Sequence, residues 1–175
     1  MKVLENWDLI NEAGEVKRLP GGPQICKIIE AIDVPEKEYL DVYFDIAEGE
    51  YKGYFSALFN STNKNYGRTA RSYKSAATPF FKAFITAVEK SNPGYEWNWD
   101  EKTLSNKYVV VVFREEEYLV DGQVKIMARP DEFRSIQAFK EGKIVTKPLK
   151  KLESAPTETA IPVAPVGIDD KDLPF

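Results

Sequence analysis

The sequence predicts a mainly β protein: a small barrel followed by an acidic C-terminal tail. Runs of alternating or β-branched residues predict strands, one amphipathic stretch predicts a helix, and the composition after Lys147 shifts to proline, threonine, alanine and acidic residues. The chain has 175 residues, 43% of them hydrophobic, which suits one domain with a buried core plus a tail.

Three strands are expected before the helix. The turn residues of 19–23, Leu-Pro-Gly-Gly-Pro, mark the start of the compact domain, and the first strand covers 24–33. The second strand, 39–46, alternates strictly. Its core face holds Leu40, Val42, Phe44 and Ile46, and its wet face holds Tyr39, Asp41, Tyr43 and Asp45. The third strand covers 51–59, with Gly53 at a bend.

A long polar loop, 60–78, should lead into the helix. Thr78 is expected as the N-cap and Pro79 as the first helical residue, and the helix runs to Lys90. Residues at helical spacing predict the buried stripe, namely Phe80, Phe81, Phe84, Ile85 and Val88.

The remaining strands follow the helix. A strand is expected over 108–114, interrupted by the three glutamates 115–117, and Asp121-Gly122 predicts a hairpin turn before a return strand over 124–128. After a break at Pro130, residues 133–139 extend that strand.

Three strands, a helix and two further strands are the connectivity of an OB-fold, a five-stranded barrel with its helix between strands 3 and 4. The expected domains are an N-terminal arm (1–19), an OB-like nucleic-acid-binding domain (20–147), a flexible linker (148–168) and an acidic protein-docking tip (169–175).

The tip combines three carboxylates with an apolar end. The carboxylates are Asp169, Asp170 and Asp172, and the apolar end is Leu173-Pro174-Phe175. No regular element buries such an end, so we expect it to enter an apolar pocket with a basic rim on another protein. A frayed polar terminus is the alternative interpretation.

The tip resembles the C-terminus of bacterial single-stranded DNA-binding proteins, an acidic run closed by Ile-Pro-Phe that recruits replication and repair enzymes. Leu173 stands at the isoleucine, Pro174 and Phe175 match the end, and Lys171 departs from the acidic run. The resemblance implies that residues 169–175 bind partner proteins of replication or recombination.

Charge is distributed unevenly along the chain. Residues 153–175 carry the whole net charge of −4, and residues 1–152 are neutral overall. Residues 51–88 hold no acidic residue, although they contain six Lys or Arg and four Tyr. Cations attract phosphates and exposed rings stack on bases, so this segment predicts a single-strand interface. The expected contacts are Arg68, Arg71, Tyr73 and Lys74, then Tyr54, Tyr66, Lys64 and Lys52. A merely solvated basic loop is the alternative.

A second resemblance covers most of residues 19–150. The motifs are Leu19-Pro20-Gly21-Gly22, the run Phe-Asp-Ile-Ala-Glu-Gly-Glu-Tyr-Lys-Gly at 44–53, Ser-Tyr-Lys at 72–74 and Phe-Phe-Lys at 80–82. They are similar to small proteins encoded in the replication or recombination regions of phages of Gram-positive bacteria. Some of these are proposed to bind single-stranded DNA.

Catalysis has little support in the sequence. There is no histidine, and Cys26 lies in an apolar strand where a buried thiol is expected. The glutamates 115–117 and the pair Asp169-Asp170 could hold a divalent ion, although solvated charge runs are commoner. We expect no enzymatic activity, no cofactor and no metal. A single cysteine, no signal peptide and no apolar run of about 18 residues predict a protein of the bacterial host's cytoplasm, not of its membrane.

The sequence therefore predicts a phage-type protein that binds single-stranded DNA without sequence preference and recruits partners through its tip. A homo-oligomer is compatible with this prediction. The alternative is a protein-only adaptor or inhibitor that mimics the tail of a host single-stranded DNA-binding protein. A nuclease is a more distant alternative.

Overall fold

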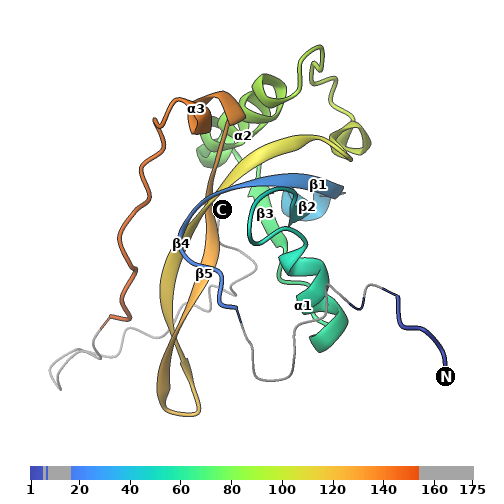
Figure 1. Ribbon diagram of the computed structural model, residues 1–175. Coiled ribbons are helices and arrows are strands. Elements are labelled where there is room, and N and C mark those ends of the chain that lie inside the picture. The colour runs from blue at the N-terminus through green and yellow to red at the C-terminus, as the bar shows by residue number, and fades with distance from the viewer. Residues whose placement is uncertain (6, 8–16, 154–175) are drawn as a thin grey trace, which may run out of the picture.

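The computed structural model describes residues 1–5, 7 and 17–153, in which an antiparallel sheet coils into a nearly closed five-stranded barrel (Figure 1). The strands are β1 (Gly22–Val34), β2 (Tyr39–Ile46), β3 (Arg68–Ser72), β4 (Tyr108–Val120) and β5 (Gln123–Arg134). Their order in the sheet is β3-β2-β1-β4-β5, and helix α2 (Thr78–Ser91) connects β3 to β4. The OB-like fold class predicted from the sequence is confirmed. No helix in this part of the chain is long and apolar enough to cross a membrane.

β1 holds the two sides of the barrel together. Its first half pairs with β4, from Gly22 against Phe113 onward, and its second half pairs with β2, ending with Val34 against Tyr39. A bulge next to Ile28 bends the strand between the two halves. β3 and β5 are therefore the two edges of the sheet.

Aromatic rings fill the barrel. The ring of Phe44 lies 5.7 Å from that of Phe55, 6.2 Å from that of Phe113 and 6.4 Å from that of Phe133, measured between centroids. Phe84 of α2 closes one end, 4.7 Å from Phe133. The four residues predicted for the core face of β2 are all buried, so the alternation of that strand was interpreted correctly.

The strand predicted over 51–59 is wrong, because helix α1 (Tyr54–Thr62) occupies most of this segment. Asp45, at the end of β2, caps the helix: Oδ1 accepts the backbone N–H of Phe55 at 2.9 Å, and Oδ2 accepts that of Ser56 at 3.1 Å. These bonds satisfy donors that a helix start leaves open, and they place a negative charge at the positive end of the helix dipole. Gly53, predicted at a bend of a strand, precedes the helix with a φ of 75°.

The third strand lies inside the predicted polar loop 60–78. β3 pairs with β2 from Arg68 against Tyr43 to Ser72 against Tyr39. Gly67 directly before it is buried, and a Cβ there would stand 2.3 Å from the carbonyl oxygen of Phe44. The absence of a side chain at Gly67 lets the backbone pass against the core.

Helix α2 matches its prediction except at its start. Thr78 is its first residue, not the N-cap, and its Oγ1 donates to the Lys74 carbonyl at 3.2 Å. Phe81, Phe84 and Val88 are buried, but Phe80 is 68% exposed. With about 3.6 residues per turn, Phe80 points roughly a quarter turn away from the centre of the buried stripe.

β4 and β5 form one long hairpin that extends beyond the barrel (Figure 1). β4 continues through the glutamates expected to interrupt it, and β5 continues through Pro130, where a break was expected. Proline is tolerated because β5 pairs on one side only. The predicted turn is confirmed, with positive φ at Asp121 and Gly122. The extension predicted over 133–139 is correct only as far as Arg134, where β5 ends, and helix α3 (Ile136–Lys140) replaces the rest.

The chain then returns along β4. Backbone bonds of 2.9 Å join the N–H of Lys150 to the carbonyl of Glu115, and the N–H of Glu117 to the carbonyl of Lys150. The range predicted as a linker therefore begins with residues paired to the hairpin.

Candidate nucleic-acid interface

The outer face of β2 and β3 carries the strongest combination of rings and cations. The β2 side chains that point away from the core are Tyr39, Asp41 and Tyr43, since Leu40 and Val42 between them are buried. Cross-strand pairing places Arg68 of β3 beside Tyr43. On the other side, β1 contributes Ile32 opposite Asp41, and 42% of Ile32 is exposed.

Arg68, Asp41 and Tyr43 form one cluster on this face. Arg68 Nε donates to Asp41 Oδ1 at 2.7 Å, Nη2 lies 2.6 Å from Oδ2, and the guanidinium carbon is 5.5 Å from the centroid of the Tyr43 ring. The Tyr43 hydroxyl donates to Asp41 Oδ2 at 3.2 Å. The bidentate ion pair therefore fixes the guanidinium over the ring, which suits stacking against a flat ligand.

The electrostatics of the cluster follow from this geometry. The hydrogen bond to Asp41 raises the pKa of Arg68, while burial and then Asp41 raise the pKa of Tyr43. Arg68 therefore stays a cation and Tyr43 a neutral ring at physiological pH. Half of the Arg68 side chain is exposed, and the Asp41 side chain is only 8% exposed. Solvent and ligands consequently meet the arginine and not the carboxylate.

Other predicted contacts lie around α1 and its connection to β3. Lys64 and Tyr66 are exposed in that connection, directly before Arg68, and Lys52 is exposed ahead of α1. Tyr54 is partly buried, and its ring packs edge-on against Phe55 at 5.2 Å. Lys64, Tyr66 and Arg68 thus follow one another at alternate positions along the chain, whereas Tyr54 belongs mainly to the core.

Arg71 contradicts the expectation of an exposed loop residue. It is 6% exposed, and its guanidinium carbon lies 4.3 Å from the Phe133 ring centroid, between the edge strands β3 and β5. Nε and Nη2 have no hydrogen-bond partner among the described residues, and burial lowers the pKa of Arg71 to about 10. Arg71 therefore helps close the barrel and is not available to a phosphate.

Tyr73 and Lys74 do not belong to the cluster around Arg68. Lys74 is exposed after β3, whereas Tyr73 lines a cavity of about 300 Å³. The Tyr73 hydroxyl donates to Asp33 Oδ1 at 2.7 Å, and Glu101 also lines the cavity. Two carboxylates make this cavity unsuitable for a phosphate.

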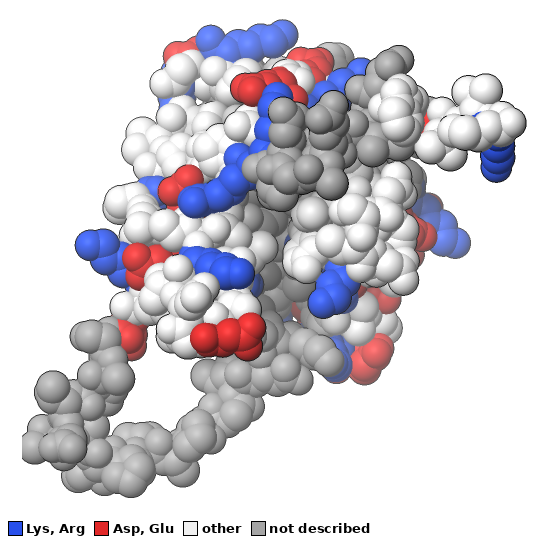
Figure 2. Space-filling view, turned by 60° about the horizontal axis from the view of Figure 1, so that its bottom comes forward, with Lys and Arg blue, Asp and Glu red and all other residues white. Residues whose placement is uncertain are grey.

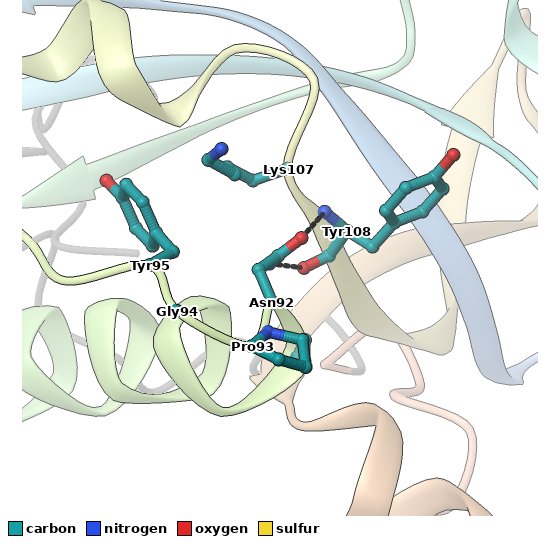
Figure 3. Close-up of a pocket in the computed structure, with 7 residues that line it drawn as sticks. Asn92, Pro93, Gly94, Tyr95, Lys107 and Tyr108 are labelled. Atoms are coloured by element: carbon teal, nitrogen blue, oxygen red, sulfur yellow. Dashed lines mark hydrogen bonds between the residues drawn. The ribbon is translucent and has the colours of Figure 1, made fainter.

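A second hollow, of about 430 Å³, lies where α2 ends beside the start of β4 (Figure 3). Asn92 joins the two elements: its amide nitrogen donates to the Tyr108 carbonyl at 2.8 Å, and its Oδ1 accepts the Tyr108 N–H at 2.9 Å. Lys107 lies 4.9 Å from the centroid of the Tyr95 ring, and Lys27 lies 6.0 Å from that of Tyr108. The rim is basic and aromatic.

The sequence interpretation missed Tyr39 and Tyr43, although its alternating pattern had placed both on the wet face of β2. It also missed Lys107 and Trp99, which come together with other side chains only through the tertiary fold. The face turned forward in Figure 2 carries both signs of charge separated by uncharged surface. No single basic patch covers it.

The remaining sequence candidates are the thiol of Cys26, carboxylates that could hold a metal ion, and the docking tip. Cys26 is fully buried and burial raises the pKa of its thiol, as the sequence predicted for a structural residue. Over 1–5, 7 and 17–153, no three carboxylate or thiol residues group in a way that could hold a metal ion. The predicted docking residues Asp169, Asp170, Asp172, Leu173, Pro174 and Phe175 lie outside the described residues.

No protein-family model matches the chain, and a search of curated proteins gives no significant match.

Proposed function

We propose that the protein binds single-stranded DNA without sequence preference in phage replication or recombination, and that residues 169–175 recruit partner proteins. One observation carries the DNA-binding part: on the outer face of an OB-like barrel, the ion pair with Asp41 holds Arg68 over the ring of Tyr43. The proposal is for a binding protein and contains no chemical step.

Aromatic rings and cations contribute to the proposed DNA binding in different ways. Stacking of a base on an aromatic ring contributes about 1–3 kcal/mol and does not depend on which base it is. Lys52, Lys64 and Lys74 supply exposed cations without any acid between residues 51 and 88. A duplex hides the faces of its bases, so this surface favours the unpaired strand.

The test is fluorescence anisotropy with an oligothymidine of about 20 nucleotides and the matching duplex, over a series of salt concentrations. We expect preference for the single strand and an affinity that falls steeply as salt rises. Equal affinity for the two, or no dependence on salt, would overturn the proposal.

Substitutions test which surface of the protein binds DNA. Tyr43→Ala should weaken binding by about 5- to 150-fold, the range that corresponds to loss of one stacked base. Replacing Lys52, Lys64 and Lys74 together by glutamine should reduce the slope of the salt dependence. Lys140→Gln is the matched control, because Lys140 is exposed on α3, which packs on α2 and β4.

The tip is tested separately. Deleting residues 173–175 should abolish capture of replication or recombination proteins while DNA binding stays at least as strong. Loss of DNA binding in this variant would contradict the division of labour. If the lysine variants kept partner capture and the parent protein bound no DNA, a protein-only adaptor would replace the proposal.

A further inference from the structure

The cavity that Tyr73 lines combines aromatic rings with carboxylates. Four of its eight lining residues are aromatic and two are acidic; the lining residues are Asp33, Leu40, Tyr73, Thr78, Phe81, Trp97, Trp99 and Glu101. Its volume of about 300 Å³ is at the small end of the roughly 300–1,000 Å³ that ligand pockets occupy. The space therefore suits one side chain better than a folded surface.

Trp99 is held on the surface. It is 83% exposed, with a φ of 65° that non-glycine residues rarely adopt, and its ring centroid lies 6.2 Å from that of Trp97. The backbone N–H of Trp97 donates to Glu89 Oε1 at 2.8 Å, and this bond fixes the segment that contains both tryptophans to α2. A largely exposed indole on a strained backbone is typical of a binding residue.

The charge around the cavity is negative. Asp33 accepts the Tyr73 hydroxyl, and the pKa of Tyr73 rises to about 12 through burial, this hydrogen bond, and the charges of Asp33, Glu38 and Glu36. Glu101, which also lines the cavity, adds a further carboxylate. DNA phosphates and the acidic residues 169–175 are both repelled by this potential, in this chain or in a second copy.

We propose that this cavity binds an arginine side chain presented by a basic segment of a partner polypeptide. The planar guanidinium stacks on indole faces and pairs with carboxylates in a bidentate manner, and it loses its hydration more readily than the ammonium of lysine. The aliphatic part of the side chain would contact Leu40 and Phe81. The proposal is independent of DNA binding, because it uses another surface with the opposite charge.

The test uses the full chain labelled with ¹⁵N and follows the indole N–H signals of its three tryptophans. The probe is an acetylated Gly-Arg-Gly amide, compared with the same peptide carrying citrulline, which is nearly isosteric but uncharged. We expect the signals of Trp97 and Trp99 to shift with the arginine peptide while that of Trp7 stays. The citrulline peptide should bind at least about tenfold more weakly.

Variants then separate the aromatic and the ionic contributions. Trp99→Ala should weaken binding of the arginine peptide about tenfold, and Glu101→Gln about fivefold. Glu96→Gln is the matched control, since Glu96 is exposed in the same segment and does not line the cavity. Because Trp99 is exposed, its replacement should leave the melting temperature unchanged.

Three outcomes would overturn the proposal. The first is equal binding of the arginine and citrulline peptides, which would make the cavity merely apolar. The second is no shift of Trp97 or Trp99 with any peptide. In the third, an oligonucleotide moves these two signals at lower concentration than the peptide does, which would make a nucleobase the occupant.

Discussion

Arg68 and Arg71, three residues apart on β3, meet opposite environments. Arg68 has a carboxylate partner and is half exposed, whereas Arg71 is buried on the Phe133 ring with two nitrogens unpartnered within the described part of the chain. A buried cation without a full set of partners destabilises the folded state. Removal of one member of an ion pair also destabilises it, because the other member is left without its counter-charge. The two residues should therefore respond to substitution in opposite ways.

Arg68→Met should lower the free energy of unfolding by about 1–3 kcal/mol, because it leaves the carboxylate of Asp41 without its cation. Arg71→Met should leave the free energy unchanged or raise it by about 1 kcal/mol. Urea denaturation at neutral pH measures both. A larger loss in Arg71→Met than in Arg68→Met would contradict this assignment.

Arg71 also predicts a dependence on pH. Burial lowers the pKa of Arg71 to about 10, so above that pH the folded chain loses a proton that the unfolded chain still binds. Stability from this residue then rises with pH. The difference in free energy of unfolding between Arg71→Met and the parent protein should shrink as the pH passes from 9 to about 11. Both proteins contain the same tyrosines and lysines, so the titration of those groups contributes equally to both and cancels in the difference.

The tight packing around Gly67 predicts that adding a single methyl group there lowers stability. An alanine there would place its Cβ 2.3 Å from a backbone oxygen, which can only be relieved by a shift of the chain, so Gly67→Ala should cost about 2–4 kcal/mol. Gly49→Ala is the control: Gly49 has a φ of 90° and open space around it, so only backbone strain of about 1 kcal/mol is expected. Similar melting temperatures for the two variants would disprove the close approach.

At the scale of elements, α1 depends on one distant carboxylate. Asp45→Ala should cost about 1–2 kcal/mol and make the amides of residues 54–62 exchange faster with deuterium, since the helix loses its cap. Glu48→Ala, at an exposed position in the following turn, should change neither. Unchanged exchange in Asp45→Ala would show that α1 does not need the cap.

The elements also show what the sequence could and could not predict. β2 and α2 follow from periodicity, because one face of each is buried and the other wet. α1 has one buried residue, Phe55, so its sequence pattern fits a strand as well as a helix. The helix is favoured by its cap, Asp45, which lies ten residues before Phe55 in the chain. β3 has no apolar run and exists through its pairing with β2.

The candidate sites divide in the same way. The sequence placed Arg68, Lys64 and Tyr66 in a basic segment, and they are exposed or half exposed there. Arg71 could not be predicted as buried, because its contact with Phe133 joins residues 62 positions apart in the chain. The cavity lined by Trp97 and Trp99 likewise draws its residues from β1, β2, the turn after β3, α2 and the segment after α2.

At the scale of the whole molecule, the excess negative charge lies beyond the barrel. Residues 153–175 hold the whole net charge of −4, so a chain ending at 152 should bind single-stranded DNA about two- to fivefold more tightly at low salt. The gain should vanish at high salt, where charges are screened. Anisotropy titrations of both chains at several salt concentrations check this, with the duplex as the reference ligand.

The two edges of the sheet affect how the protein behaves at high concentration. An open strand edge is a template on which another chain can polymerise. Here β3 is only five residues long and is followed closely by α2, while β5 carries Pro130 between the charged residues Arg129 and Asp131. The barrel therefore stays unclosed by hydrogen bonds and yet resists edge-to-edge aggregation when the protein is concentrated.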